Sequence, residues 1–154
     1  MIQENDKIAP FSLPATNGES LAAHNDDGFN TLLFFYPKDD TPGCTIESCE
    51  FNELVSVFES HKVRVYGVSG DNLDSHKLFQ SKYGLTFPLL YDKDYELSKT
   101  LGIYGKQEWQ GKVFEGIKRT SLLIDSQGKV LKVYENVDPK GHAERVLNDI
   151  IEGI

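Results

Sequence analysis

The two cysteines of this 154-residue chain, Cys44 and Cys49, lie five residues apart just after a strongly apolar run. The run "TLLFFY" at 31–36 predicts a buried strand, and residues from about 43 to 60 predict a helix, so both thiols fall at the join. The free N–H groups of a helix's first turn stabilise an anion, and a thiolate is an anion. The position of Cys44 therefore favours thiol chemistry.

The helical period places the two thiols on different faces. At about 100° per residue, Cys44 points with the apolar stripe of the predicted helix, whereas Cys49 is turned away by about 140°. That stripe consists of Phe51, Leu54, Val55 and Phe58. We expect Cys44 to be buried and Cys49 to be more exposed. Their α-carbons would be roughly 8–9 Å apart in an intact helix, which is beyond the ~7 Å limit for a disulfide.

Other functions for the cysteines have to be weighed. A buried cysteine often acts only as a small apolar side chain. A zinc site needs four ligands, and the C-x₄-C spacing could be completed only by histidines scattered along the chain. These are His24, His61, His76 and His142. The C-x-x-C motif of a thioredoxin-type reductase does not occur.

Charge and composition exclude several classes of protein. Sixteen Lys and Arg against 24 Asp and Glu give a formal net charge of −8, which argues against binding to nucleic acid or to an anionic membrane. No apolar run is long enough to span a bilayer, and the start "MIQENDK" lacks the features of a signal peptide. We expect a cytoplasmic protein, and in a reducing compartment a cysteine pair is seldom a structural disulfide.

The remaining segments predict one α/β domain over residues 1–154. The order is strand, helix, strand, helix, strand, helix, β-hairpin and helix, which favours a thioredoxin-like fold: a central mixed sheet with a parallel centre and an antiparallel edge. Predicted strands are 31–36, 63–69, 87–92, 119–125 and 130–135, and predicted helices are about 43–60, 74–83, 94–101 and 139–151.

The segment "FYPKDDTPGCTIESC" resembles the active-site segment of peroxiredoxins, specifically the bacterioferritin-comigratory protein (BCP) or PrxQ subfamily. Its motif P-x₃-T-x₂-C is filled here by Pro37, Thr41 and Cys44. The resemblance extends to "KIAPFSLPATNGES", which is similar to the family's N-terminal β-hairpin, and to "VDPKGHAERVL", which is similar to its last helix. It implies a thioredoxin fold with an N-terminal extension.

The resemblance also implies an activity, the thiol-dependent reduction of hydrogen peroxide and organic hydroperoxides, which protects cells against oxidative stress. Cys44 would attack the peroxide and become a sulfenic acid. Cys49 matches the resolving cysteine and would form an intramolecular Cys44–Cys49 disulfide, which thioredoxin or glutaredoxin would reduce. Because sulfur carries the electrons, no cofactor or metal is implied. We expect a monomer.

Neighbouring residues receive roles from the same resemblance. Thr41 would offer its hydroxyl to the peroxide and the thiolate, and the backbone N–H groups of Gly43 and Cys44 would add donors for the substrate. Pro37 would shield the thiolate from water and hold the loop rigid.

Arg119 matches the family's distal arginine, whose positive charge stabilises the thiolate. The chain reads Arg-Thr-Ser where the family usually has Arg-Ser-Thr, so Thr120 and Ser121 exchange hydroxyl types. Asp39 and Asp40 are interpreted as turn and capping residues.

Two rival functions remain open from the sequence. A redox sensor would form the same disulfide to change a partner surface, and it would consume peroxide only once per molecule. A binding module would show an ordinary thiol and no fast reaction with peroxide. Steady turnover of peroxide with a thiol reductant distinguishes the three functions.

Overall fold

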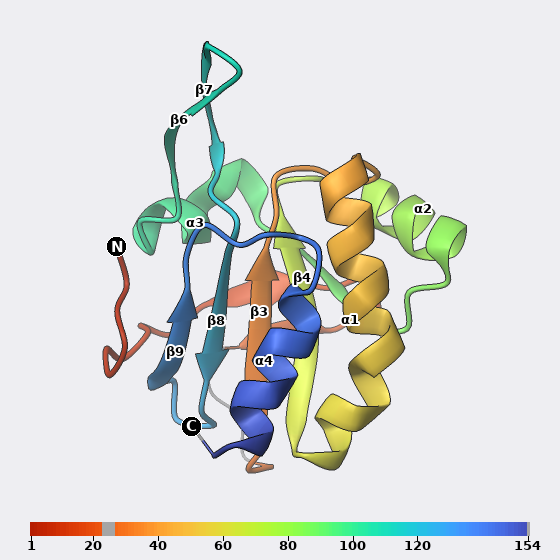
Figure 1. The fold of residues 1–154 in the computed structure, drawn as a ribbon, viewed down its shortest axis with the longest axis vertical. Helices are drawn as coiled ribbons and strands as arrows, with labels where there is room; N and C mark the ends of the chain where they lie inside the picture. The colour runs from red at the N-terminus through yellow and green to blue at the C-terminus, as the bar shows by residue number, and fades with distance from the viewer. Residues whose placement is uncertain (23–26, 154) are drawn as a thin grey trace.

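A five-stranded mixed sheet with strand order β5–β4–β3–β8–β9 forms the centre of the computed structural model, which describes residues 1–22 and 27–153 (Figure 1). Its strands are β3 (Asn30–Phe35), β4 (Val63–Ser69), β5 (Leu89–Tyr91), β8 (Thr120–Ile124) and β9 (Val130–Tyr134). The β3–β4 and β4–β5 pairs are parallel, whereas β8 is antiparallel to both β3 and β9. The predicted parallel centre and antiparallel edge are confirmed.

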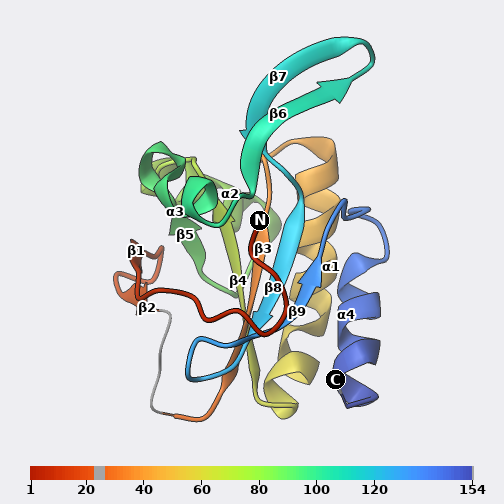
Figure 2. The same ribbon diagram turned by 90° about the vertical axis from the view of Figure 1, so that its left-hand side faces the viewer.

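Alternating side chains of β3 divide the core between the two faces of the sheet. Leu32 and Phe34 join one buried cluster and Leu33 and Phe35 join the other, which explains why the strand reads as a continuous apolar run. Helices α1 (Pro42–Ser60) and α4 (His142–Ile151) cover the first face side by side (Figure 1). Helix α3 (Glu96–Thr100) and the N-terminal segment cover the second face (Figure 2).

Helix boundaries follow from local caps. Helix α2 (Leu73–Tyr83) starts after Asn72, whose side chain accepts from the Ser75 N–H, and ends at Gly84 in the left-handed conformation. The predicted helix at 94–101 is shorter, because a 3₁₀ turn η1 (Lys93–Tyr95) precedes α3. The predicted start of the last helix at Pro139 is wrong by three residues, because Gly141 is its left-handed N-cap.

Two β-hairpins lie outside the central sheet. The N-terminal hairpin pairs β1 (Ser12–Pro14) with β2 (Ser20–Ala22), as expected from the resemblance. The second pairs β6 (Tyr104–Trp109) with β7 (Lys112–Ile117) and projects from the body of the molecule (Figures 1 and 2). The sequence analysis missed it because most of β7 is exposed and carries no apolar face for a core.

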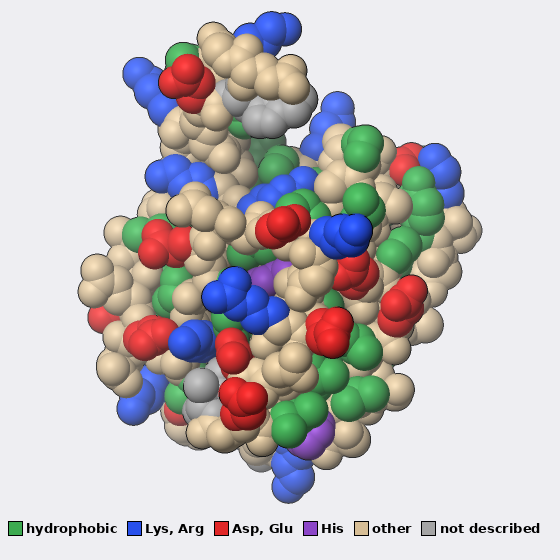
Figure 3. All heavy atoms as spheres, in the orientation of Figure 1, with side chains coloured by type: hydrophobic (Ala, Val, Ile, Leu, Met, Phe, Trp, Pro, Cys, Tyr) green, Lys and Arg blue, Asp and Glu red, His purple; other side chains and the backbone are tan. Residues whose placement is uncertain are grey.

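Acidic and basic side chains are interspersed over the face formed by α1 and α4 (Figure 3). This mixed distribution offers no positively charged surface there to a nucleic acid. Within the described residues, no helix is both long enough and apolar enough to cross a bilayer.

Candidate active site

Cys44 is the third residue of α1 and is fully buried. The chain leaves β3 and enters α1 through a loop that ends at Thr41, the N-cap, whose extended backbone is followed by Pro42 at the first helical position. The Thr41 side chain does not cap the helix, and the N–H groups of Gly43 and Cys44 belong to the first helical turn, which has no intrahelical acceptors for them. Cys44 therefore lies where an anion is stabilised.

The guanidinium of Arg119 contacts the Cys44 sulfur directly. Its Nη2 donates to Cys44 Sγ at 3.1 Å and its Nη1 donates to Glu47 Oε1 at 3.1 Å. Arg119 immediately precedes β8, and the pairing of β8 with β3 brings it beside a helix that begins more than 70 residues earlier. Only 20% of the Arg119 side chain is exposed, so little water screens its charge from the thiol.

Gly43 leaves the space through which Arg119 reaches the sulfur. A Cβ at this position would lie 2.7 Å from Arg119 Nη2 and 3.3 Å from Pro139 Cγ. Any side chain here would push the guanidinium away from Cys44. The sequence alone indicates only a backbone role for Gly43, because this close approach depends on tertiary packing.

Glu47 is a site residue that the sequence analysis missed. Its side chain is 1% exposed, and burial raises its pKa to about 8, against the opposing effect of the Arg119 charge. At neutral pH the carboxyl therefore keeps its proton, and the positive charge of Arg119 stays available to Cys44. Its spacing of three residues from Cys44 places both on one side of the helix and could have indicated it.

The raised pKa of Glu47 predicts a pH-dependent stability. The folded protein keeps this proton up to about pH 8, while the unfolded chain releases it near the ordinary value of 4.5. Folding is therefore progressively weakened as the pH rises from about 4.5 to about 8. Because glutamine can still accept from Arg119, we expect Glu47→Gln to be more stable than wild type at neutral pH, by up to about 3 kcal/mol.

Urea denaturation of both proteins at about pH 5 and about pH 7 measures this difference. The gap in free energy of unfolding should be large at the higher pH and small at the lower one. Equal gaps at both values would show that the Glu47 carboxyl is ionised in the folded protein.

Thr41 and Pro37 flank the cysteine in the loop. The Thr41 hydroxyl donates to the Lys38 carbonyl at 2.8 Å, so its hydrogen is not directed at the thiolate, contrary to the expectation from the sequence. Its oxygen remains free to accept a hydrogen bond from a peroxide. Pro37 is half-buried and follows Tyr36, whose N–H still pairs with the Val68 carbonyl at 3.0 Å. A proline at this point cannot extend the ladder.

Cys49 lies on the next turn of α1 and is partly exposed, as the helical period predicts. Neither cysteine is in a disulfide in this structure. Partial burial raises the pKa of the Cys49 thiol, and the negative charge of Glu53 adds to this effect. The two thiols therefore differ in electrostatic surroundings, since Cys44 faces a cation and Cys49 faces an anion.

The interpretation of Asp39 and Asp40 as turn residues is confirmed, since both lie in the turn before α1 and Asp40 has a φ of 57°. The interpretation of them as capping residues is wrong, because the N-cap of α1 is Thr41. Asp40 accepts from Lys82 at 2.7 Å and from Tyr83 at 2.6 Å, whereas Asp39 is buried among other partners.

The histidines do not gather around the cysteines. His76 and His142 are buried, and His142 makes a 2.8 Å hydrogen bond with Ser121 Oγ. Burial lowers the pKa of His142 to about 4, so its ring is neutral. His61 is exposed, and His24 lies outside the described residues. Across 1–22 and 27–153, no group of metal-ligating side chains includes a cysteine.

Comparison with known proteins agrees with this geometry. The AhpC/TSA family profile matches residues 5–133. This chain belongs to the AhpC/TSA family. It is 39% identical over 146 residues to a putative peroxiredoxin bcp of Coxiella burnetii, covering 95% of this chain and 97% of the relative. It is 37% identical over 142 residues to peroxiredoxin Bcp of Escherichia coli, covering 92% and 91%.

Solved peroxiredoxin structures share the fold. A mutant of Xylella fastidiosa PrxQ has a TM-score of 0.89 at 31% identity and covers 99% of this chain and 97% of its own. The bacterioferritin comigratory protein of Xanthomonas campestris, described for its alkyl peroxide reduction activity, has a TM-score of 0.83 at 32% identity and covers 92% and 90%. The chain is therefore a thioredoxin-like peroxiredoxin of the BCP/PrxQ type, a thiol peroxidase that uses a peroxide and a thiol reductant.

Proposed function

We propose that this peroxiredoxin reduces hydrogen peroxide and organic hydroperoxides through a sulfenic acid at Cys44. The thiolate attacks the terminal peroxide oxygen, the O–O bond breaks, and the second oxygen takes a proton and leaves as water or alcohol. The observation that carries this proposal is the 3.1 Å contact between Arg119 Nη2 and Cys44 Sγ at a helix N-terminus. The alkyl peroxide reduction described for the Xanthomonas relative supports organic substrates.

The proposed donors surround the place where charge develops. Negative charge grows on the leaving oxygen, and Arg119 with the N–H groups of Gly43 and Cys44 would stabilise it. The Thr41 oxygen would accept the hydrogen bond of the bound peroxide, and Pro37 would keep water from the sulfur. Arg119, Thr41 and Pro37 act through their side chains, so each of these three can be tested by its own variant.

Cys49 would then resolve the sulfenic acid. Its thiolate attacks the Cys44 sulfur, water leaves, and a Cys44–Cys49 disulfide forms. Thioredoxin, or alternatively glutaredoxin, would return both residues to thiols by thiol–disulfide exchange. We propose that the chain does this as a single thioredoxin-like domain over residues 1–154, as a monomer, in the cytoplasm, where it protects the cell against oxidative stress.

Disulfide formation requires α1 to open between the two cysteines, because an intact helix holds them roughly 8–9 Å apart. The intervening residues have an unusual burial pattern. Glu47 and Ser48 are buried although polar, and the Ser48 hydroxyl has no hydrogen-bond partner among the described residues. Ile46 is 45% exposed, so much of its side chain already contacts solvent. Opening this turn therefore frees polar groups and loses little apolar packing.

We expect this opening to appear in hydrogen exchange. Amides 45 to 50 should exchange slowly in the dithiol form and much faster in the disulfide form, because their helical hydrogen bonds, which begin with Thr45 N–H to the Thr41 carbonyl, are broken. Strands β3 and β4 should change little. If amides 45 to 50 stayed protected in a protein with a verified Cys44–Cys49 disulfide, the helix would not need to open.

Coupled turnover tests the proposed function as a whole. Hydrogen peroxide and an organic hydroperoxide are supplied with NADPH, thioredoxin reductase and thioredoxin, and in parallel with a glutaredoxin system. Steady NADPH consumption with either reductant supports a peroxidase. A single equivalent of peroxide consumed per chain, without turnover in either system, would indicate a redox sensor instead.

A further inference from the structure

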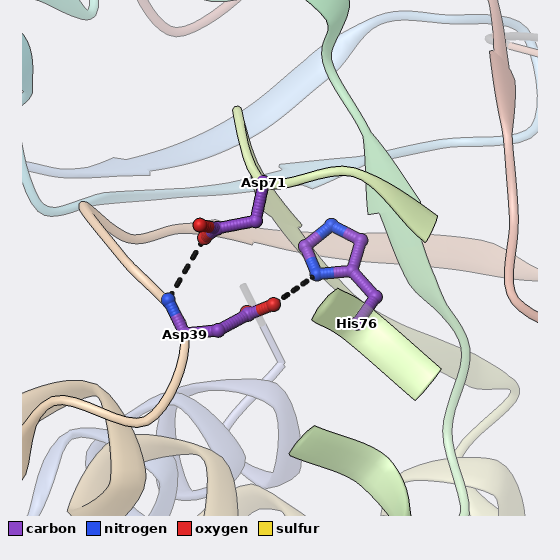
Figure 4. Close-up of side chains that lie close together, drawn as sticks. All are labelled: Asp39, Asp71 and His76. Atoms are coloured by element: carbon purple, nitrogen blue, oxygen red, sulfur yellow. Dashed lines mark hydrogen bonds and ion pairs between the residues drawn. The ribbon is translucent and has the colours of Figure 1, made fainter. Parts of the chain in front are cut away.

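Asp39 connects the cysteine loop to three other parts of the fold. Its Oδ1 accepts from the Tyr36 hydroxyl at 2.6 Å and its Oδ2 accepts from Ser75 Oγ, in α2, at 2.8 Å. Its own N–H donates at 2.8 Å to Asp71, which follows β4 (Figure 4). Asp39 is only 7% exposed, so these bonds replace contacts with water that the carboxylate has lost.

His76 extends these connections into the core. Its Nδ1 lies 2.7 Å from Asp39 Oδ2 (Figure 4). Its Nε2 lies 2.9 Å from the Leu90 carbonyl in β5. A carbonyl only accepts, so Nε2 carries a hydrogen. Another proton must lie between Nδ1 and Oδ2, because two acceptors at 2.7 Å would repel each other. His76 is fully buried, and the pair therefore fixes Asp39 relative to the sheet.

We propose that Asp39 and His76 are positioning residues for peroxide reduction, holding the cysteine loop so that Thr41 faces the substrate correctly. The physical link is short. Asp39 directly follows Lys38, whose carbonyl receives the Thr41 hydroxyl hydrogen and so sets where the Thr41 oxygen points. The proposal rests on the proposed reaction at Cys44. It concerns a different part of the site from Arg119, which approaches from the β8 side.

A metal site is the alternative interpretation of this cluster. Ligand atoms of Asp39, Asp71 and His76 lie within 4.8 Å of one another. They are already used, however. Asp71 Oδ2 accepts from Ser69 at 2.7 Å and from the Asp39 N–H, and Asp39 Oδ2 is bonded to His76. The hydrogen bonds are satisfied without an ion, so the cluster is better explained as an anchor for the loop.

Two substitutions at Asp39 test the proposal. Alanine removes every side-chain bond. Asparagine can rebuild them, because its oxygen can accept from Tyr36 while its two N–H hydrogens reach Ser75 and a neutral His76. We expect Asp39→Ala to slow the reaction with hydrogen peroxide at least about tenfold, since small misplacements of reacting groups have large effects on rate. We expect the peroxide rate of Asp39→Asn to stay within about threefold of the wild-type rate, because the rebuilt hydrogen bonds keep the loop in place.

A second reaction distinguishes positioning from general damage. Alkylation of Cys44 by iodoacetamide, measured in a Cys49→Ser background, needs the thiolate but not the peroxide-binding groups. In Asp39→Ala this rate should change by less than about twofold, because Arg119 and the helix N-terminus are intact. Asp74→Asn is the matched control, because it changes an exposed carboxylate of α2 outside the cysteine loop and should leave both rates unchanged.

The outcomes are distinct. The proposal is overturned if Asp39→Ala loses its peroxide and alkylation rates equally, or if its peroxide rate equals that of wild type. It is also overturned if Asp39→Asn reacts with peroxide as slowly as Asp39→Ala. A peroxide rate that falls on EDTA treatment and returns with a divalent cation would overturn it as well. If Asp39→Ala does not fold, Tyr36→Phe takes its place. Its peroxide rate should fall by a smaller factor while its alkylation rate stays unchanged, and a peroxide rate equal to that of wild type overturns the proposal. Wild-type activity in Cys44→Ser would instead reject the proposed function itself.

Discussion

Cys44→Ser should abolish peroxide consumption, whereas Cys49→Ser should still react rapidly with one equivalent of peroxide and then stop. A serine hydroxyl stays protonated at neutral pH and cannot replace the thiolate that Arg119 and the start of α1 stabilise. In Cys49→Ser the sulfenic acid forms but has no partner thiol on the same chain. Stopped-flow mixing with hydrogen peroxide, followed by trapping with dimedone, measures both steps.

The two variants control for each other, because each removes one sulfur atom from the same helix. Dimedone should label Cys49→Ser strongly and Cys44→Ser not at all. A fast reaction of peroxide with Cys44→Ser would assign the nucleophile to Cys49, and the geometry around Arg119 would then have no catalytic meaning.

Arg119→Ala should slow the peroxide step by about 10²-fold, the effect of removing one donor that stabilises developing negative charge. The rate of Cys44 alkylation by iodoacetamide should fall as well, because this reaction needs the thiolate that Arg119 contacts. The loss of stability should be limited, because the other partner of Arg119, Glu47, keeps its proton at neutral pH and is not left as a buried unpaired charge. Arg119→Lys should restore only part of the rate, because one ammonium group cannot reach both Cys44 and Glu47 as the forked guanidinium does.

The comparison of alanine and lysine at this position separates charge from geometry. If lysine restores the full rate, the site needs only a positive charge. An unchanged second-order rate constant in Arg119→Ala would remove this residue from the site, whatever its distance from the sulfur.

The sequence alone predicted those features of the structure that a local pattern determines. The apolar run at 31–36 predicted the central strand, and the helical period predicted that Cys44 is buried and Cys49 is more exposed. Pro37, Thr41 and Arg119 came from the resemblance, and the structure places all three in or beside the cysteine loop or helix start. Their catalytic roles remain predictions until the variants are measured.

Groups brought together by the sheet could not be predicted in the same way. Asp39 meets His76 only because the parallel strands end at one edge, where α2 begins. Glu47 was missed because a carboxylate on a helix is normally solvated, and its burial depends on Arg119 arriving from the β8 side.

The central claim is that Cys49 resolves the oxidised Cys44 within one chain, and peptide mapping by mass spectrometry tests it most directly. The reduced protein is treated with one equivalent of hydrogen peroxide, remaining thiols are blocked, and the chain is digested without reductant. We predict a Cys44–Cys49 cross-linked fragment in monomeric protein, lost after treatment with thioredoxin. Two results would contradict the account. One is a sulfenic acid at Cys44 together with a Cys49 that carries the blocking reagent, which shows that its thiol was still free; the other is a disulfide that joins two chains.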